Sequence, residues 1–140
     1  MGTYDPRYLA GVVLFNAQDF FEAHELWEDL WAESQGNERR FYQGLIQAAV
    51  GLCHFYNGNL AGAVKLYRSS RDYMEPCGAS FLGMDLVSFW RQMERCYGEL
   101  LTSATPDRSL RPDPALMPRI TLEPAPESWP DPDDYLPDED

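Results

Sequence analysis

The chain has 140 residues, enough for one domain with its own core and too few for two ordinary domains. Its net charge of -12 argues against a nucleic-acid partner or an anionic membrane surface, because both require clustered Lys and Arg side chains. The three cysteines are widely spaced, and neither a signal peptide nor a membrane-spanning apolar run is apparent, so we expect a cytoplasmic protein.

Capping and helix-breaking residues divide the first hundred residues into about five predicted helices. Asp5, Asp19 and Asn59 are of the residue types that cap helix N-termini, and proline follows Asp5 at the first helical position. The predicted helices span approximately 6–16, 19–35, 37–56, 59–75 and 85–100. No segment alternates with period two for long enough to form a core strand. The sequence therefore predicts a compact all-α bundle.

The composition changes sharply near residue 103. Residues 103–140 contain nine of the eleven prolines and form an acidic segment, whereas residues 1–102 carry nearly all the helical periodicity. We therefore expect a helical domain over 1–102 and an extended Pro-rich acidic tail over 103–140, with the last dozen residues disordered. The apolar side chains of residues 116–122 are expected to strap that part of the tail to the helical body.

The second predicted helix carries polar residues within its aromatic stripe. On a helical wheel centred on His24, Trp27 and Trp31 lie within about 60° on one side, and Glu28 lies about 40° away on the other. We therefore expect His24 and Glu28 to be at least partly buried and to need hydrogen-bond partners.

A second polar stripe follows the third predicted helix, which is otherwise apolar around most of its circumference. Gln43, Gln47 and His54 fall within roughly 40° of one another on its wheel. A short connection makes helices two and three an antiparallel hairpin, which places Gln47 between the levels of His24 and Glu28. His54 lies about 10 Å from Gln47 along the axis, so one small ion cannot contact every member.

Three interpretations of His24 and Glu28 remain open. They form a buried hydrogen-bonded pair that aligns two helices, or they belong to a pocket in which His24 is the acid–base group and Glu28 orients it. In the third, the two side chains are low-ranking metal ligands, because the run resembles the zinc motif H-E-x-x-H with its second histidine replaced by glutamate. No further ligand is clearly placed, so no metal is expected.

The adjacent residues Arg39 and Arg40 lie beside the predicted hairpin turn. They are placed to clamp an anionic ligand, although exposed basic residues near a helix start usually have no specific role.

Two sequence blocks carry a resemblance to a known family. Glu22–Trp31 reads E-A-H-E-x-x-E-x-x-W, and Gly44–Ala49 reads G-L-I-Q-x-A in the matching order and spacing. With His54 and Pro118–Leu122, this pattern resembles domain-of-unknown-function family 309. The resemblance implies a compact fold of about five helices and no established reaction. Its recurrent polar residues correspond to His24, Glu25, Glu28, Gln43, Gln47 and His54.

Together these observations predict a polar pocket between helices two and three that binds a small ligand or performs acid–base chemistry. Its candidate residues are His24, Glu25, Glu28, Trp31, Gln43, Gln47 and His54. The alternative is a non-enzymatic helical module for protein–protein interaction, in which these residues have a structural role. The sequence specifies no catalytic residue and no cofactor. It also does not decide whether the partner is a small molecule or a protein.

Overall fold

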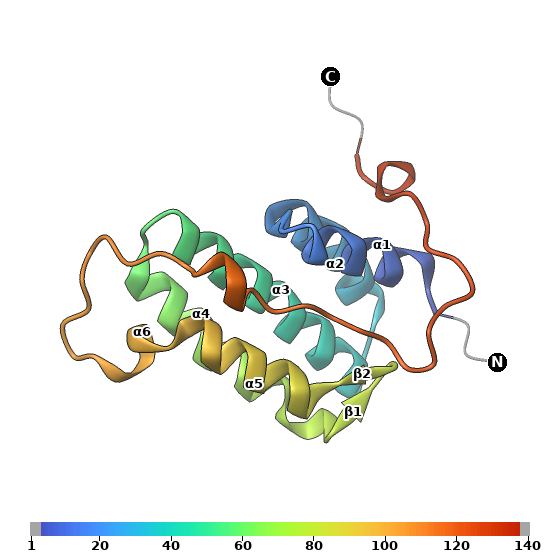
Figure 1. Ribbon diagram of the computed structural model, residues 1–140. Coiled ribbons are helices and arrows are strands. Elements are labelled where there is room, and N and C mark those ends of the chain that lie inside the picture. The colour runs from blue at the N-terminus through green and yellow to red at the C-terminus, as the bar shows by residue number, and fades with distance from the viewer. Residues whose placement is uncertain (1–3, 138–140) are drawn as a thin grey trace.

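A computed structural model describes residues 4–137 of the chain and is predominantly helical, as the sequence predicts (Figure 1). The α-helices are α1 (Pro6–Asn16), α2 (Phe20–Glu33), α3 (Gly36–Tyr56), α4 (Leu60–Met74), α5 (Leu86–Tyr97) and α6 (Glu99–Thr102). The remaining elements are strands β1 (Ser80–Phe81) and β2 (Met84–Asp85) and the 3-10 helices η1 (Glu75–Cys77), η2 (Pro114–Leu116) and η3 (Pro132–Asp134). No helix in the described range is long and apolar enough to cross a membrane.

Most of the predicted helix starts are confirmed by their side-chain caps. The Asp5 carboxylate accepts a hydrogen bond from the backbone N–H of Arg7 at 2.9 Å, and Asn59 caps α4 in the same manner. Asp85 caps α5 through the backbone N–H of Ser88 at 3.0 Å. Asp19 precedes α2 but forms no side-chain cap. The side chains of Asp5, Asn59 and Asp85 thus accept hydrogen bonds from backbone N–H groups that the first helical turn leaves unpaired.

Two local features depart from the predicted five helices. The fifth predicted helix breaks at Gly98, whose φ of +38° ends α5, so that residues up to Thr102 form the separate helix α6. A short hairpin precedes α5, and its turn contains Leu82 and Gly83 with φ values of +45° and +79°. A two-residue hairpin turn of this kind needs positive φ at both positions. Leucine rarely adopts positive φ, so the residue types at this turn did not predict the hairpin.

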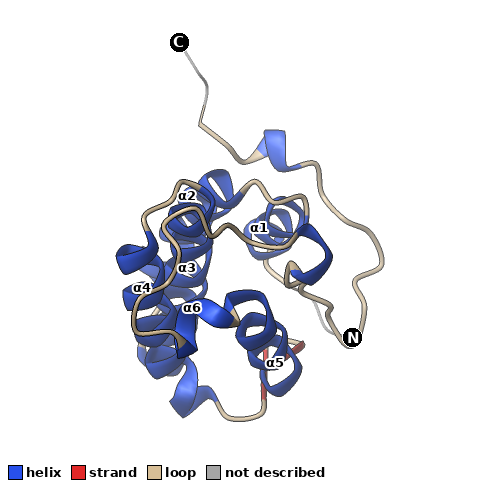
Figure 2. Ribbon diagram, turned by 60° about the vertical axis from the view of Figure 1, so that its left-hand side comes forward, coloured by secondary structure: helices blue, strands red, loops and turns tan. Residues whose placement is uncertain are grey.

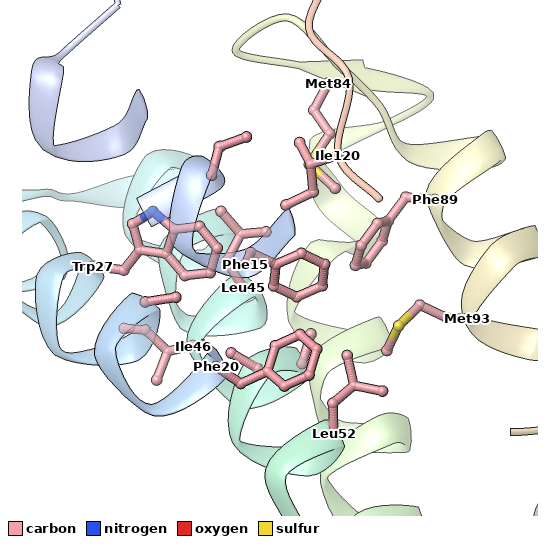
Figure 3. Packing of buried hydrophobic residues seen from close by; sticks show 14 of the residues in the cluster. Phe15, Phe20, Trp27, Leu45, Ile46, Leu52, Met84, Phe89, Met93 and Ile120 are labelled. Atoms are coloured by element: carbon pink, nitrogen blue, oxygen red, sulfur yellow. The ribbon is translucent and has the colours of Figure 1, made fainter. Parts of the chain in front are cut away.

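The central helix is α3, which packs between α2 and α4. These three helices form a row, and α1 and α5 lie across one side of it (Figure 2). Phe15 of α1 lies at the centre of the core, with its ring centroid 6.1 Å from that of Trp27 and 6.0 Å from that of Phe89 (Figure 3). Within residues 4–137, no α-helix covers the other side of α3.

The glycines of α3 allow α4 to approach closely. A β-carbon at Gly44 would lie 2.5 Å from Met74 Cγ, and one at Gly51 would lie 3.2 Å from Leu66 Cβ. The packing of α4 against α3 therefore leaves no room for a side chain at Gly44 unless Met74 moves, and leaves little room at Gly51.

The segment 119–123 is bound to the helical body by backbone and side-chain contacts. Asn16 at the end of α1 both donates to the Ile120 carbonyl (2.9 Å) and accepts from its N–H (2.8 Å). Ile120 and Leu122 are buried, and Leu122 pairs with Met84 as an isolated β-bridge. In Figure 1 this strap runs lengthwise between α1 and α5. The tail therefore contributes side chains to the core.

The expectation of disorder over the last dozen residues is wrong for their described part. Residues 132–134 form η3, which contacts α1, and Leu136 packs against the core. An apolar side chain at position 136 gives this acidic segment an attachment that its composition did not indicate. Residues 138–140 lie outside the described residues.

Gly11 is required where α1 meets α2. A β-carbon at this position would overlap the indole of Trp27, which is fully buried. The indole also donates from Nε1 to the Tyr8 carbonyl at 3.4 Å.

We expect Gly11→Ala to lower the free energy of unfolding by about 1–3 kcal/mol through overpacking. Helix propensity alone predicts the opposite sign, a gain of about 1 kcal/mol. Urea unfolding of Gly11→Ala in the wild-type and Trp27→Leu backgrounds measures the effect, which should shrink in the second background because the overlapping ring is absent. Equal destabilisation in both backgrounds would contradict this account.

An ion-pair network joins the start of α1 to the end of α2. Arg7 donates to both Glu33 oxygens, at 3.0 and 2.7 Å, and to the Asp5 carboxylate at 3.0 Å. The hydrogen bonds and charge of Arg7 lower the pKa of Glu33. Burial acts to raise the pKa of Asp5, but the hydrogen bonds and charge of Arg7 outweigh it, and this pKa is lowered as well.

A carboxyl group with a lowered folded-state pKa stabilises the protein above its unfolded pKa of about 4 and loses that contribution as the pH falls through the folded value. We therefore expect Arg7→Gln to unfold more readily than wild type at pH 6 and the difference to shrink as the pH is lowered toward 2. Urea unfolding at a series of pH values measures it. A difference that stays constant across this range would show that Arg7 acts by packing alone.

Candidate functional site

The candidate residues of α2 lie at the edge of the core and beyond it. The buried side of α2 consists of Phe20, Ala23, Leu26, Trp27 and Leu30. His24 is next to this side and its side chain is 16% exposed, which fits the prediction of partial burial. For Glu28 the prediction is wrong, because its side chain is 57% exposed. The aromatic residues predicted a buried side of α2 centred on His24. In the structure α1 and α3 instead pack against the side that carries Ala23 and Leu26, and Glu28 is turned toward solvent.

The His24 ring is held by its own helix. Its Nδ1 donates to the backbone carbonyl of Phe21, and the two rings meet edge to face with centroids 4.9 Å apart. Because a carbonyl oxygen only accepts, the neutral ring carries its proton on Nδ1 and leaves Nε2 as an acceptor. Nε2 lies 3.5 Å from Glu28 Oε1. Hence His24 and Glu28 are neighbours, with Glu28 on the solvent side.

A row of half-buried residues follows the uncovered side of α3. Gln43, Gln47, Val50 and His54 are half-buried, while the positions between them are mostly buried. Gln47 Oε1 is buried and has no hydrogen-bond partner among the described residues. Within residues 4–137, neither His24 nor Glu28 forms a hydrogen bond with Gln47. The two polar stripes are thus present, but no direct bond connects them.

His54 lies in the last turn of α3 and contacts the turn between α3 and α4. The Asn59 side-chain amide donates to His54 Nδ1 at 3.3 Å, while its oxygen caps α4. This pairing orients the capping residue. Glu25 is half-buried on α2, and its carboxylate forms no ion pair or hydrogen bond within the described part of the chain. No hydrogen bond or ion pair between described residues brings His54 or Glu25 together with Gln47.

Trp31 and Gln43 do meet, in a pocket of about 270 Å³ beside the turn between α2 and α3. We call it the arginine pocket; it is lined by Trp31, Gly36, Arg39, Arg40, Gln43 and Tyr73. The Arg39 guanidinium carbon lies 4.0 Å from the centroid of the Trp31 ring, and that of Arg40 lies 5.0 Å from the centroid of Tyr73. The adjacent pair Arg39 and Arg40 was visible in the sequence. Tyr73 could not be linked to them from the sequence, because it lies on α4 and reaches the pocket only through the packing of α4 against α3.

Metal-binding and nucleophilic groups are sparse. Among residues 4–137, no cluster of three or more His, Cys, Asp or Glu side chains is placed to hold a metal ion. His24 and Glu28 together would supply two ligands. Burial is the main cause that raises the pKa of the Cys96 thiol to about 11, which disfavours the thiolate form. Cys96 is therefore a packing residue.

Comparison with known proteins gives a family and two relatives. Residues 8–66 match a family model described as a domain of unknown function, DUF309. The chain is 34% identical over 103 residues to the uncharacterized protein YpuF of Bacillus subtilis (strain 168), covering 71% of this chain and 59% of YpuF. An uncharacterized protein of Aquifex aeolicus (strain VF5) is 31% identical over 85 residues, which are 60% of this chain and 26% of that protein. The matches therefore span less than two thirds of either relative.

We expect His24→Ala and Glu28→Gln to differ in their effect on stability. His24→Ala removes a hydrogen bond and a ring contact, which should lower the free energy of unfolding by about 1 kcal/mol. Glu28 is largely solvent-exposed, so Glu28→Gln should change it by less than about 0.5 kcal/mol. Thermal unfolding at pH 7 compares the two. Equal, large losses would instead indicate that the pair acts as one structural unit.

Proposed function

We propose, on the premise that the chain belongs to the DUF309 family through residues 8–66, that the open face of α2 and α3 binds a small ligand. All the candidate residues fall within this matched segment. The open face is defined here by His24 and Trp31 of α2 and by Gln43 and Gln47 of α3. These side chains are half-buried, so each presents part of its surface to a ligand. The Gln47 Oε1 atom itself is covered, so a ligand reaches it when the Gln47 side chain turns outward.

The observation that carries the proposal is the unpaired acceptor of Gln47. Leaving a buried acceptor without a hydrogen bond costs about 1–3 kcal/mol, which an apolar side chain at the same position would avoid. Helix α3 is otherwise mostly apolar near Gln47, where Ile46, Ala48 and Ala49 are buried. A glutamine at this place is favourable when a bound molecule donates the missing hydrogen bond.

The arrangement favours binding over catalysis. General acid–base catalysis needs groups that converge on one reacting atom. Here His24 Nδ1 is occupied by the Phe21 carbonyl, and His54 is paired with Asn59 at the end of α3. The remaining acceptor, His24 Nε2, lies beside the Glu28 carboxylate. This nitrogen and Gln47 are the groups to which we assign hydrogen bonds with the ligand.

A second candidate function, protein–protein interaction, is favoured by exposed aromatic residues near one end of α2. The side chains of Phe21 and Tyr56 are exposed and line a pocket of about 320 Å³ with Cys53 and others. Aromatic side chains that are exposed together are typical of protein interfaces. Tyr56→Ser would weaken such an interface while leaving a small ligand at Gln47 bound, because the Tyr56 side chain contacts Gln18 and Phe20 and not His24.

We expect Gln47→Met to abolish ligand binding while leaving stability equal or slightly raised, because it removes the unpaired acceptor at nearly constant volume. A library of small polar compounds is screened by amide chemical shifts of the 15N-labelled protein, and thermal unfolding is measured in parallel. Supporting hits shift the signals of Trp31, Gln43 and Gln47 and are lost in Gln47→Met.

The control variant is Gln92→Met, because Gln92 lies on α5 and is half-buried like Gln47. It accepts a hydrogen bond from the Arg119 N–H at 2.9 Å, so this change should lower stability without affecting ligand binding. Hits that bind Gln47→Met as well as wild type, or a marked loss of stability in Gln47→Met, would contradict the proposal.

A further inference from the structure

The arginine pocket combines two cationic side chains with two aromatic rings from different helices. Trp31 comes from α2, Arg39 and Arg40 from α3 and Tyr73 from α4. Since the guanidinium carbon of Arg39 lies over the Trp31 ring, the planar group is supported on one face. Arg40 is placed by Tyr73 and by a hydrogen bond of 3.2 Å to the Asp72 carbonyl.

Both guanidinium groups retain unused hydrogen-bond donors. Within residues 4–137, Arg39 forms no side-chain hydrogen bond and Arg40 forms only the bond to the Asp72 carbonyl. Neither is in an ion pair with a described carboxylate, in contrast to Arg7, which binds both Asp5 and Glu33. A planar guanidinium matches the oxygen geometry of carboxylate and phosphate groups, and prior support by an aromatic ring reduces the entropy lost on binding.

The charge of the lining distinguishes this pocket from another arginine-containing pocket. A pocket of about 640 Å³ between α4 and α5 contains Arg71 and Arg91, but its lining also includes the acidic residues Asp72, Glu75 and Glu94. The lining of the arginine pocket includes no acidic residue, so its two arginines give it a net positive charge. In a chain of net charge -12, this is a local field that attracts anions.

The geometry points to an anion-binding site: Arg39 and Arg40, with the Gln43 amide, bind the carboxylate or phosphate headgroup of the ligand. This inference rests on the proposed function only in assigning the headgroup to the ligand of the open face. The pocket volume of about 270 Å³ holds a headgroup and a few further atoms. The rest of the ligand extends along α3 toward Gln47, which is one helical turn, or about 6 Å, beyond Gln43.

The exposed Glu28 carboxylate sets a condition on that extension. Glu28 lies one turn from Trp31 on the same side of α2, so the part of the ligand next to it is neutral or cationic. The ligand class is therefore a molecule with an anionic group at one end only.

The test is a titration of the 15N-labelled full chain at constant ionic strength with three probes. Inorganic phosphate and N-acetylglycine supply the two headgroups, and N-acetylglycinamide is the neutral counterpart of N-acetylglycine. Saturating shifts at Arg39, Arg40, Gln43 and the Trp31 indole are expected with one or both anions and not with the amide. Saturation by inorganic phosphate would identify a phosphate headgroup, and saturation by N-acetylglycine would identify a carboxylate.

The variants Arg39→Gln and Arg40→Gln should each raise the dissociation constant of the anion at least tenfold. Arg68→Gln is the matched control. Arg68 is exposed on α4, so this substitution removes the same charge at a position outside the pocket. Arg40→Lys keeps the charge but lacks the planar fork, and should also weaken binding. Shifts that never saturate with either anion, or that respond equally to Arg68→Gln, would overturn the inference.

The result is separable from that of the proposed function. A library ligand that requires Gln47 but binds Arg39→Gln and Arg40→Gln normally overturns the anion site alone. Anion binding that requires both arginines, with no ligand sensitive to Gln47→Met, supports the anion site and counts against the proposed function.

Discussion

The closeness of α1 to α2 determines which side of α2 faces the core. Gly11 leaves room for the Trp27 indole, and the Tyr8 carbonyl accepts its N–H, so that Trp27 is completely enclosed. This fixes the rotation of α2 about its own axis. His24 and Glu28 follow from Trp27 by helical geometry and come to lie at and beyond the edge of the core. The open face thus depends on a packing contact on the opposite side of the helix.

Helix α3 combines close packing and polarity on different sides. Gly44 and Gly51 face α4 at distances that leave little room for a side chain, while Gln43 and Gln47 lie on the side left uncovered. Such a helix is apolar enough to be central and still carries polar groups, because one narrow strip of it borders solvent. The unpaired acceptor of Gln47 is unfavourable in the isolated protein. Under the proposed binding role, a ligand that donates a hydrogen bond to this acceptor removes that cost.

Aromatic residues act differently in the core and at the arginine pocket. In the core, Phe15 joins Trp27 and Phe89 across three helices and supplies apolar area. In the pocket, Trp31 and Tyr73 support cationic side chains. The chain is strongly acidic overall, but these contacts concentrate positive charge at one end of the open face. For the proposed anion site, the local placement of charge therefore matters more than the net charge of the chain.

The sequence by itself determined the helical class, most helix starts and the resemblance of residues 8–66 to DUF309, because capping residues, 3–4 periodicity and the E-A-H-E-x-x-E-x-x-W block are local signals. It also placed Gln43, Gln47 and His54 on one side of α3, since that follows from helical geometry. Only the tertiary structure decided that Glu28 is exposed, that His54 serves the α3–α4 turn and that Tyr73 joins Arg40. The physical reason is that burial and pocket formation depend on how helices rotate against one another, and this is set by long-range contacts such as that between Gly11 and Trp27.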